Sequence, residues 1–68
     1  MGRGLAYSSL RVGKKYVLLN FGERYDFEVI EIISSRDFKL KDIYTLETYL
    51  MSDLIKFGKG KDYDLYES

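Results

Sequence analysis

The segment that decides the fold reads KYVLLN at residues 15–20, FGER at 21–24, YDFEVIEII at 25–33, SSRD at 34–37 and FKLKDIY at 38–44. Three runs rich in β-branched and aromatic residues alternate with two short polar or glycine-containing clusters. This pattern is typical of a meander of antiparallel strands. We therefore predict strands at 15–20, 25–33 and 38–44, joined by two four-residue connections.

Side-chain alternation along these strands predicts one strongly apolar face. Four-residue connections pair Leu18 with Phe27 across the first turn and Phe27 with Tyr44 across the second. Because successive side chains point to opposite faces of a strand, one face then collects nine large apolar residues. This predicted core face consists of Tyr16, Leu18, Tyr25, Phe27, Val29, Ile33, Phe38, Leu40 and Tyr44.

The opposite face is also apolar, and a sheet with two apolar faces usually has both of them covered. Residues 5–10 can fold back over this face, or a bulge in the second strand can turn its isoleucines inward. If neither happens, the face is a candidate surface for a protein partner or a weak homodimer. Its five candidate partner-binding residues are Val17, Leu19, Ile30, Ile32 and Ile43.

Residues 46–57 (LETYLMSDLIKF) are compatible with two structures. Leucines and aromatic residues at helical spacing allow one continuous helix. Alternatively, residues 47–52 form a fourth strand and residues 53–57 a single helical turn, with a fifth strand at 62–67. The first alternative predicts a helix packed on a sheet, and the second predicts a small barrel.

We favour the barrel, because closure removes the edges that an open sheet of this size exposes. The predicted fold class is all-β, a five-stranded SH3-like barrel with one helical turn before the last strand. The barrel is expected to span residues 10–68. Residues 1–9 are expected to form an N-terminal segment that is flexible or covers the sheet.

The order GKKYVLLNFG, YDFEVIEI, DFKLKD and YLMSDLIKFGKGKDYDLYE resembles small bacterial SH3-like barrel proteins of the kind found in Bacteroidetes-type genomes. The likeness spans residues 10–67 and includes the FGKGKD stretch followed by a strand. It implies the barrel fold and brings no assigned activity with it. SH3-like barrels include peptide readers, Tudor-type readers and RNA-associated modules, so the fold alone does not select a function.

The composition of the 68 residues argues against several classes of function. The chain has 11 basic and 11 acidic residues, no His and no Cys. A hydrolytic triad with a His base and a conventional zinc site therefore lack their usual residues. We expect a non-catalytic protein with no metal and no cofactor. No signal-peptide or membrane-length apolar run is visible, so we expect a cytoplasmic protein.

Two classes of binding function remain. Seven tyrosines can line a peptide groove or an aromatic cage, or simply fill the core. Small barrels fill their cores with aromatic residues, so we expect most of the tyrosines to be structural. The function that we favour is a non-catalytic interaction module for a protein or peptide. The alternative is a weak nucleic-acid-binding module of the Tudor or KOW type, whose candidate phosphate contacts are Arg11, Lys14, Lys15, Lys59 and Lys61.

Overall fold

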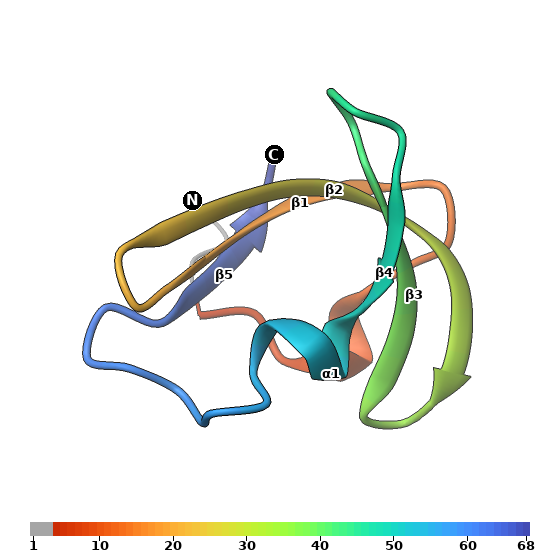
Figure 1. The fold of residues 1–68 in the computed structure, drawn as a ribbon. Helices are drawn as coiled ribbons and strands as arrows, with labels where there is room; N and C mark the ends of the chain where they lie inside the picture. The colour runs from red at the N-terminus through yellow and green to blue at the C-terminus, as the bar shows by residue number, and fades with distance from the viewer. Residues whose placement is uncertain (1–3) are drawn as a thin grey trace.

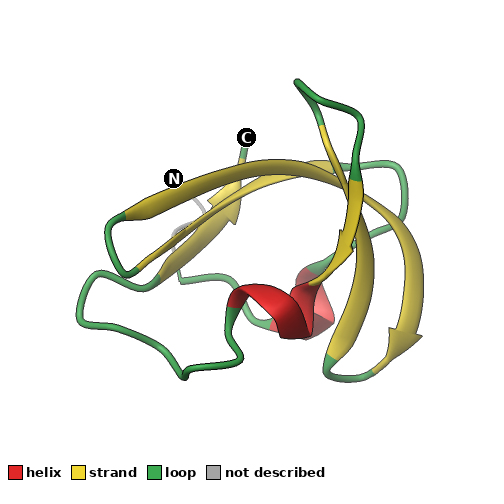
Figure 2. Ribbon diagram, in the orientation of Figure 1, coloured by secondary structure: helices red, strands yellow, loops and turns green. Residues whose placement is uncertain are grey.

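The computed structural model describes residues 4–68, which form one curved antiparallel sheet with two short helical segments (Figures 1 and 2). The hydrogen-bonded strand order is β4-β3-β2-β1-β5. The elements in chain order are η1 (Tyr7–Ser9), β1 (Lys15–Asn20), β2 (Glu23–Ser34), β3 (Asp37–Asp42), β4 (Thr48–Leu50), α1 (Met51–Leu54) and β5 (Asp64–Glu67). The predicted five strands with a helical turn before the last one are therefore confirmed. The pairing ends at β4 and β5, which are the two edge strands of the sheet.

The turn between β1 and β2 is shorter than predicted. Only Phe21 and Gly22 connect the strands, and both have positive φ angles, 51° and 76°. Two such residues are typical of a type I′ hairpin turn, whose twist matches that of the flanking strands. Leu18 consequently faces Tyr25, and the predicted Leu18–Phe27 pair is wrong by two residues. Because side chains alternate with a period of two, this slip leaves the predicted face unchanged.

The pairing of β2 with β3 contains two register shifts, one between Val29 and Glu31 and one between Ile32 and Ser34. Each bulge inserts an extra residue into β2 and bends the strand. The first half of β2 lies beside β1 and the second half beside β3, as Figure 1 shows. The second bulge leaves Ile33 49% exposed, so its predicted core position is wrong.

The third strand ends earlier than predicted, at Asp42. The Asp42 carboxylate accepts backbone hydrogen bonds from Tyr44 (2.8 Å) and Thr45 (2.9 Å), which turns the chain away from the sheet. Tyr44 is 74% exposed as a result. Its predicted place in the core and its predicted pairing with Phe27 are both wrong, because Phe27 faces Asp42.

The core lies on the concave side of the sheet. Its buried residues are Leu10, Tyr16, Leu18, Phe27, Val29, Phe38, Leu40, Met51 and Leu65. Six of these were predicted from strand alternation; the other three come from the segments before β1 and after β3. Tyr25 and Tyr49 pack against this cluster from its periphery.

Residues 46–57 contain a strand and a helical turn, so the continuous-helix alternative is wrong. Leu46 has a positive φ of 65°, which is incompatible with a helix at this point. β4 pairs with β3, placing Tyr49 opposite Leu40. The Asp53 carboxylate accepts a hydrogen bond from the Leu50 N–H at 3.2 Å, where α1 begins.

The N-terminal segment packs against the core and not over the outer face of the sheet. Leu10 is 1% exposed, and Leu5 and Tyr7 contact the core cluster. The Leu5 N–H donates to the Leu65 carbonyl at 2.9 Å, so the segment also lies along β5. Of the predicted 1–9 segment, residues 1–3 lie outside the described residues.

Candidate ligand-binding pocket

One open pocket lies where the N-terminal segment, the β2–β3 turn and the loop before β5 meet. Its volume is about 480 Å³, which falls within the range of small-ligand sites. We call it the tyrosine pocket. Its lining residues are Gly4, Leu5, Ala6, Tyr7, Ser35, Arg36, Lys59 and Tyr63.

Two tyrosines form the aromatic part of the tyrosine pocket. Tyr7 is fixed by η1 and makes an edge-to-face contact with Phe38, with ring centroids 5.7 Å apart. Tyr63 comes directly before β5, and both rings pack against the core cluster. Rings anchored in this way lose little conformational freedom when a ligand binds.

Lys59 joins the two rings electrostatically. Its ammonium nitrogen lies 4.7 Å from the ring centroid of Tyr63 and 5.3 Å from that of Tyr7. Both distances are within the range of cation–π attraction. Lys59 lies between Gly58 and Gly60, and both glycines are hydrogen-bonded to the Asn20 side chain at the end of β1.

The loop that carries Lys59 is held by buried and charged groups. The Asn20 side chain, 2% exposed, donates to the carbonyls of Leu54 (3.2 Å) and Gly58 (3.1 Å). Its oxygen accepts a hydrogen bond from the Gly60 N–H at 2.7 Å. These bonds satisfy backbone groups that would otherwise be unpaired, so the loop has one defined conformation.

Asp62 attaches the far end of the same loop to the β1–β2 turn. Its two carboxylate oxygens accept hydrogen bonds from the N–H groups of Phe21 (2.9 Å) and Gly22 (2.7 Å). Charge-assisted bonds of this kind are stronger than those between neutral groups. The loop and the turn therefore position each other, which also explains why Phe21 is held at a positive φ.

Burial and the neighbouring Tyr7 hydroxyl raise the pKa of Tyr63 well above that of an ordinary tyrosine. The Tyr63 phenol is therefore neutral at physiological pH. The Tyr7 hydroxyl is buried and lies near Tyr63 without reaching hydrogen-bond geometry, so it has no partner within residues 4–68.

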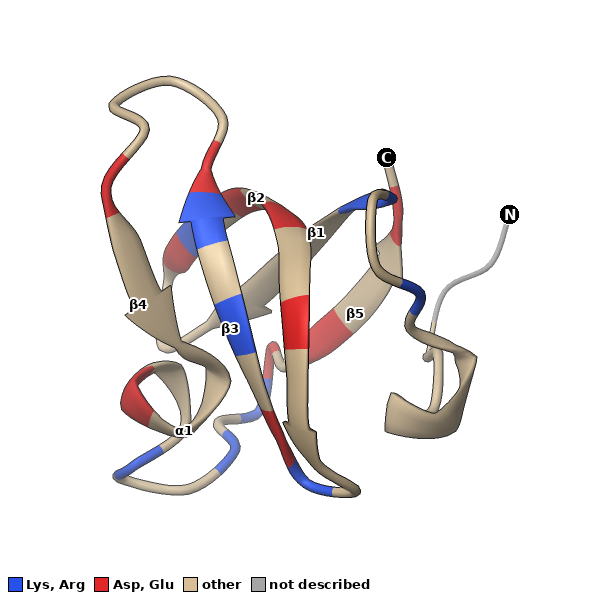
Figure 3. Ribbon diagram, turned by 90° about the vertical axis from the view of Figure 1, so that its right-hand side faces the viewer, with Lys and Arg blue, Asp and Glu red and all other residues tan. Residues whose placement is uncertain are grey.

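The five basic residues predicted to contact phosphate do not gather at one place. The Arg11 guanidinium donates to the carbonyls of Ser8 and Leu10, and Lys14 pairs with Glu67 at 3.5 Å. Lys15 begins β1, whereas the loop with the other two lysines is tied to Asn20 at the end of that strand, about 17 Å away. Basic and acidic segments are interspersed over the ribbon in Figure 3.

Of those five residues, the tyrosine pocket includes Lys59 alone. It also includes Arg36, which was not a predicted site residue, and two of the seven tyrosines considered for a groove, a cage or the core. Arg36 lies in the polar connection between two predicted strands, where an arginine is ordinarily a solvated turn residue. The loop before β5 is long enough for Lys59 to reach Tyr7 in η1, and this length was the one feature of the sequence that could have indicated the pocket.

The five residues predicted for the opposite face differ in their exposure. Val17 is 1% exposed, Ile32 is 51% exposed, and Leu19, Ile30 and Ile43 are half-buried. Val17 lies between Asp26 on β2 and Tyr66 on β5, and these longer side chains flank it on the same face. The apolar surface on this side is therefore smaller than the sequence predicts.

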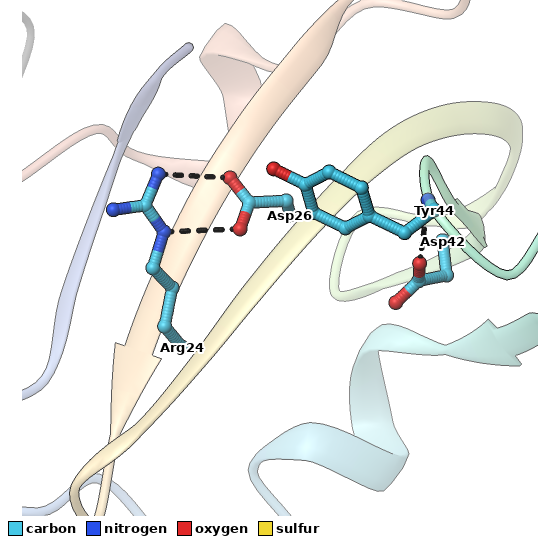
Figure 4. A network of polar contacts seen from close by, with 4 residues as sticks. All are labelled: Arg24, Asp26, Asp42 and Tyr44. Atoms are coloured by element: carbon cyan, nitrogen blue, oxygen red, sulfur yellow. Dashed lines mark hydrogen bonds and ion pairs between the residues drawn. The ribbon is translucent and has the colours of Figure 1, made fainter.

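Arg24 and Asp26 form the main polar contact of that outer face. The guanidinium donates to both carboxylate oxygens at 3.0 Å, and Asp26 is 9% exposed (Figure 4). These hydrogen bonds raise the pKa of Arg24. The Tyr44 side chain extends toward Asp26 from the β3–β4 loop. Asp26 lies opposite Val17 in the sheet, and none of these three residues lines the tyrosine pocket.

Within the described part of the chain there is no cluster of three or more His, Cys, Asp or Glu residues that is arranged to hold a metal ion. Among the same residues, no helix has the length and apolar character needed to cross a membrane. In comparisons with known proteins, no protein-family model, curated protein or solved structure matches this chain.

Proposed function

We propose that this chain is an SH3-like barrel that acts as a non-catalytic interaction module and binds a peptide segment of a protein partner in the tyrosine pocket. The observation that carries the proposal is the convergence of Tyr7 and Tyr63 at an open pocket of about 480 Å³. Tyrosines are enriched in protein-binding sites because they combine a large apolar surface with a polar hydroxyl. The absence of His and Cys from the sequence favours binding over catalysis.

Three features support the barrel. The strand order β4-β3-β2-β1-β5, with α1 before the last strand, agrees with the plan inferred from the sequence. The resemblance to small bacterial SH3-like barrel proteins spans residues 10–67. Bulges in β2 provide the bend that a small barrel requires.

The distribution of charge favours a peptide over a nucleic acid. Nucleic-acid-binding proteins gather basic residues along one face or groove. Here Arg11 and Lys14 are engaged with other groups. Lys15 begins β1, whereas the loop of the other two lysines is tied to Asn20 at the far end of that strand. The weak nucleic-acid-binding function therefore stays the alternative.

Selection of peptides and a blocking substitution test this function together. A random decapeptide library is selected against the full-length chain, and the enriched peptides are titrated into isotopically labelled protein. We expect amide shifts at Ser35, Lys59 and Tyr63. Ala6→Trp places a large side chain in the pocket from an exposed, extended position and should abolish these shifts. Ser8→Trp, an equally exposed change outside the lining, should leave them intact.

Three results would contradict the proposal. The library could yield no peptide above background, the shifts could map to another surface, or Ala6→Trp could bind as well as the original chain. A parallel titration with a single-stranded oligonucleotide addresses the alternative function. Binding of the oligonucleotide that is tighter than that of any peptide and persists at high salt would reverse the order of the two functions.

A further inference from the structure

The cationic side of the tyrosine pocket defines its ligand more narrowly. We propose that the pocket recognises an anionic group on its peptide, a carboxylate or a phosphorylated side chain, through Lys59 and Arg36. This inference rests on the proposed peptide-binding function. Both cations line the pocket, and its lining contains no Asp or Glu among residues 4–68. The chain as a whole has equal numbers of acidic and basic residues, so two cations without an acid are a local imbalance.

Neither cation is neutralised by the described part of the protein. Within residues 4–68, the ion pairs are Lys14 with Glu67 and Arg24 with Asp26, and neither involves the pocket. Arg36 is exposed in the β2–β3 turn, where its backbone N–H donates to the Ser34 hydroxyl. Its guanidinium therefore remains available to a ligand.

The position of Lys59 also argues against a cationic ligand in this pocket. An aromatic cage binds a cation by placing it against several ring faces. In this pocket the ammonium of Lys59 already lies against the rings of both Tyr7 and Tyr63. A ligand cation would meet this like charge at close range, whereas a ligand anion would be attracted to it. The two rings thus hold the Lys59 ammonium beside them in the pocket, where an anionic group of the bound peptide can meet it.

The donors at the pocket suit an oxyanion. Lys59 offers three N–H donors, Arg36 offers a planar fork of donors, and Ser35 contributes a hydroxyl. Carboxylates and phosphates share the property that several such donors bind them together, and the bonds are charge-assisted.

Matched peptides separate charge from the rest of the ligand. Three acetylated and amidated hexapeptides of one alanine-rich sequence carry, at the same two positions, glutamate, phosphoserine or glutamine. Each is titrated into the labelled full-length chain, with inorganic phosphate as a fourth probe. We expect glutamate or phosphoserine to shift the amides of Ser35, Arg36 and Lys59 and to bind at least about tenfold more tightly than glutamine. The stronger of the two anionic peptides identifies the source of the charge.

Single substitutions of the basic residues test the site, and one of them serves as the control. Lys59→Gln and Arg36→Gln should each weaken binding of the anionic peptide about tenfold or more. Lys61→Gln removes the same charge from the same loop at a residue that does not line the pocket, and should change affinity less than about twofold. A loss of affinity in Lys61→Gln as large as that in Lys59→Gln would indicate general attraction to a basic loop and would overturn the proposal.

The outcomes also distinguish this proposal from the function on which it rests. Equal binding of the glutamine and glutamate peptides at the pocket would overturn anion recognition and keep the peptide-binding function. Shifts caused by inorganic phosphate alone, with no response to any peptide, would support the anion site and contradict the peptide function. Failure of all four probes to shift the lining amides would overturn anion recognition, whereas the peptide-binding function is decided by the library selection.

Discussion

The side-chain oxygen of Asn20 accepts a 2.7 Å hydrogen bond from the backbone N–H of Gly60, forty residues further along the chain. The same amide donates to two carbonyls of the segment that includes Leu54 and Gly58. One buried polar side chain at the end of β1 therefore fixes the loop that carries Lys59. Stability and the geometry of the tyrosine pocket depend on the same residue.

Replacement of Asn20 is expected to destabilise the protein strongly. Asn20→Leu keeps the approximate volume but leaves the Gly60 N–H and two carbonyls without partners, which should lower the free energy of unfolding by about 3 kcal/mol. Urea denaturation measures this loss, and hydrogen exchange at the Gly60 amide reports the loop. Lys61→Leu, at an exposed position of the same loop, should stay within about 0.5 kcal/mol. Equal stability of the two variants would contradict the role of Asn20.

The core prediction compares two phenylalanines of opposite exposure. Phe27 is 0% exposed at the centre of the sheet and lies against the Tyr16 ring, whereas Phe57 is 82% exposed. Phe27→Ala should cost about 3 kcal/mol or more and prevent folding of a domain this small. Phe57→Ala should fold like the original chain. A well-dispersed NMR spectrum from Phe27→Ala would contradict the observed packing.

The Tyr49 hydroxyl is buried without a hydrogen-bond partner within residues 4–68. Removing an unsatisfied buried group is favourable, so Tyr49→Phe should raise the free energy of unfolding by about 1 kcal/mol. Thermal and urea denaturation at neutral pH measure the change. Tyr44→Phe is the matched control, because this tyrosine is largely exposed and its replacement should have almost no effect. A less stable Tyr49→Phe would show that the hydroxyl has a partner in solution.

Tyr49 also predicts how stability responds to alkaline pH. Burial raises the pKa of its phenol to about 12, above the ordinary value of 10.0. Because the folded chain holds this proton more tightly than the unfolded chain, the contribution to stability is complete below pH 10 and is lost as the pH rises toward 12. Absorbance of tyrosinate should show this group titrating late. In Tyr49→Phe the decline in stability between pH 10 and 12 should be smaller, and an unchanged decline would contradict the assignment.

Asp42 gives the corresponding prediction at acidic pH. Hydrogen bonds from the Thr45 and Tyr44 N–H groups hold the pKa of this carboxyl below its ordinary 3.8. Its stabilising effect is therefore present above pH 3.8 and is lost as the pH falls through the lower, folded value. The Thr45 amide shift, followed by NMR from pH 6 to 2, should have its midpoint below 3.8. Asp42→Asn should remove this transition, and a midpoint at or above 3.8 would contradict the hydrogen bonds.

The sequence alone determined the strands and most of the core, because both depend on local patterns. The run at residues 15–20 became β1 with the predicted limits, and the alternation of Leu18, Phe27 and Leu40 placed them on the buried face. Alternation has a period of two, so an error of two residues in the first turn did not disturb this result. The strand and helical turn within residues 46–57 were one of two structures that the pattern allowed.

Tertiary structure decided the features that depend on contacts between distant residues. The two bulges in β2 allow the strand to bend while it stays paired with β3, and the second bulge leaves Ile33 exposed. The tyrosine pocket exists because the loop before β5 is tied to Asn20 and thereby brings Lys59 to Tyr7. Lys59 and Tyr7 are separated by more than fifty positions, and nothing in the local sequence around either residue specifies contact with the other. Long-range hydrogen bonds and packing select that arrangement, which is why the core could be predicted from the sequence and the candidate site could not.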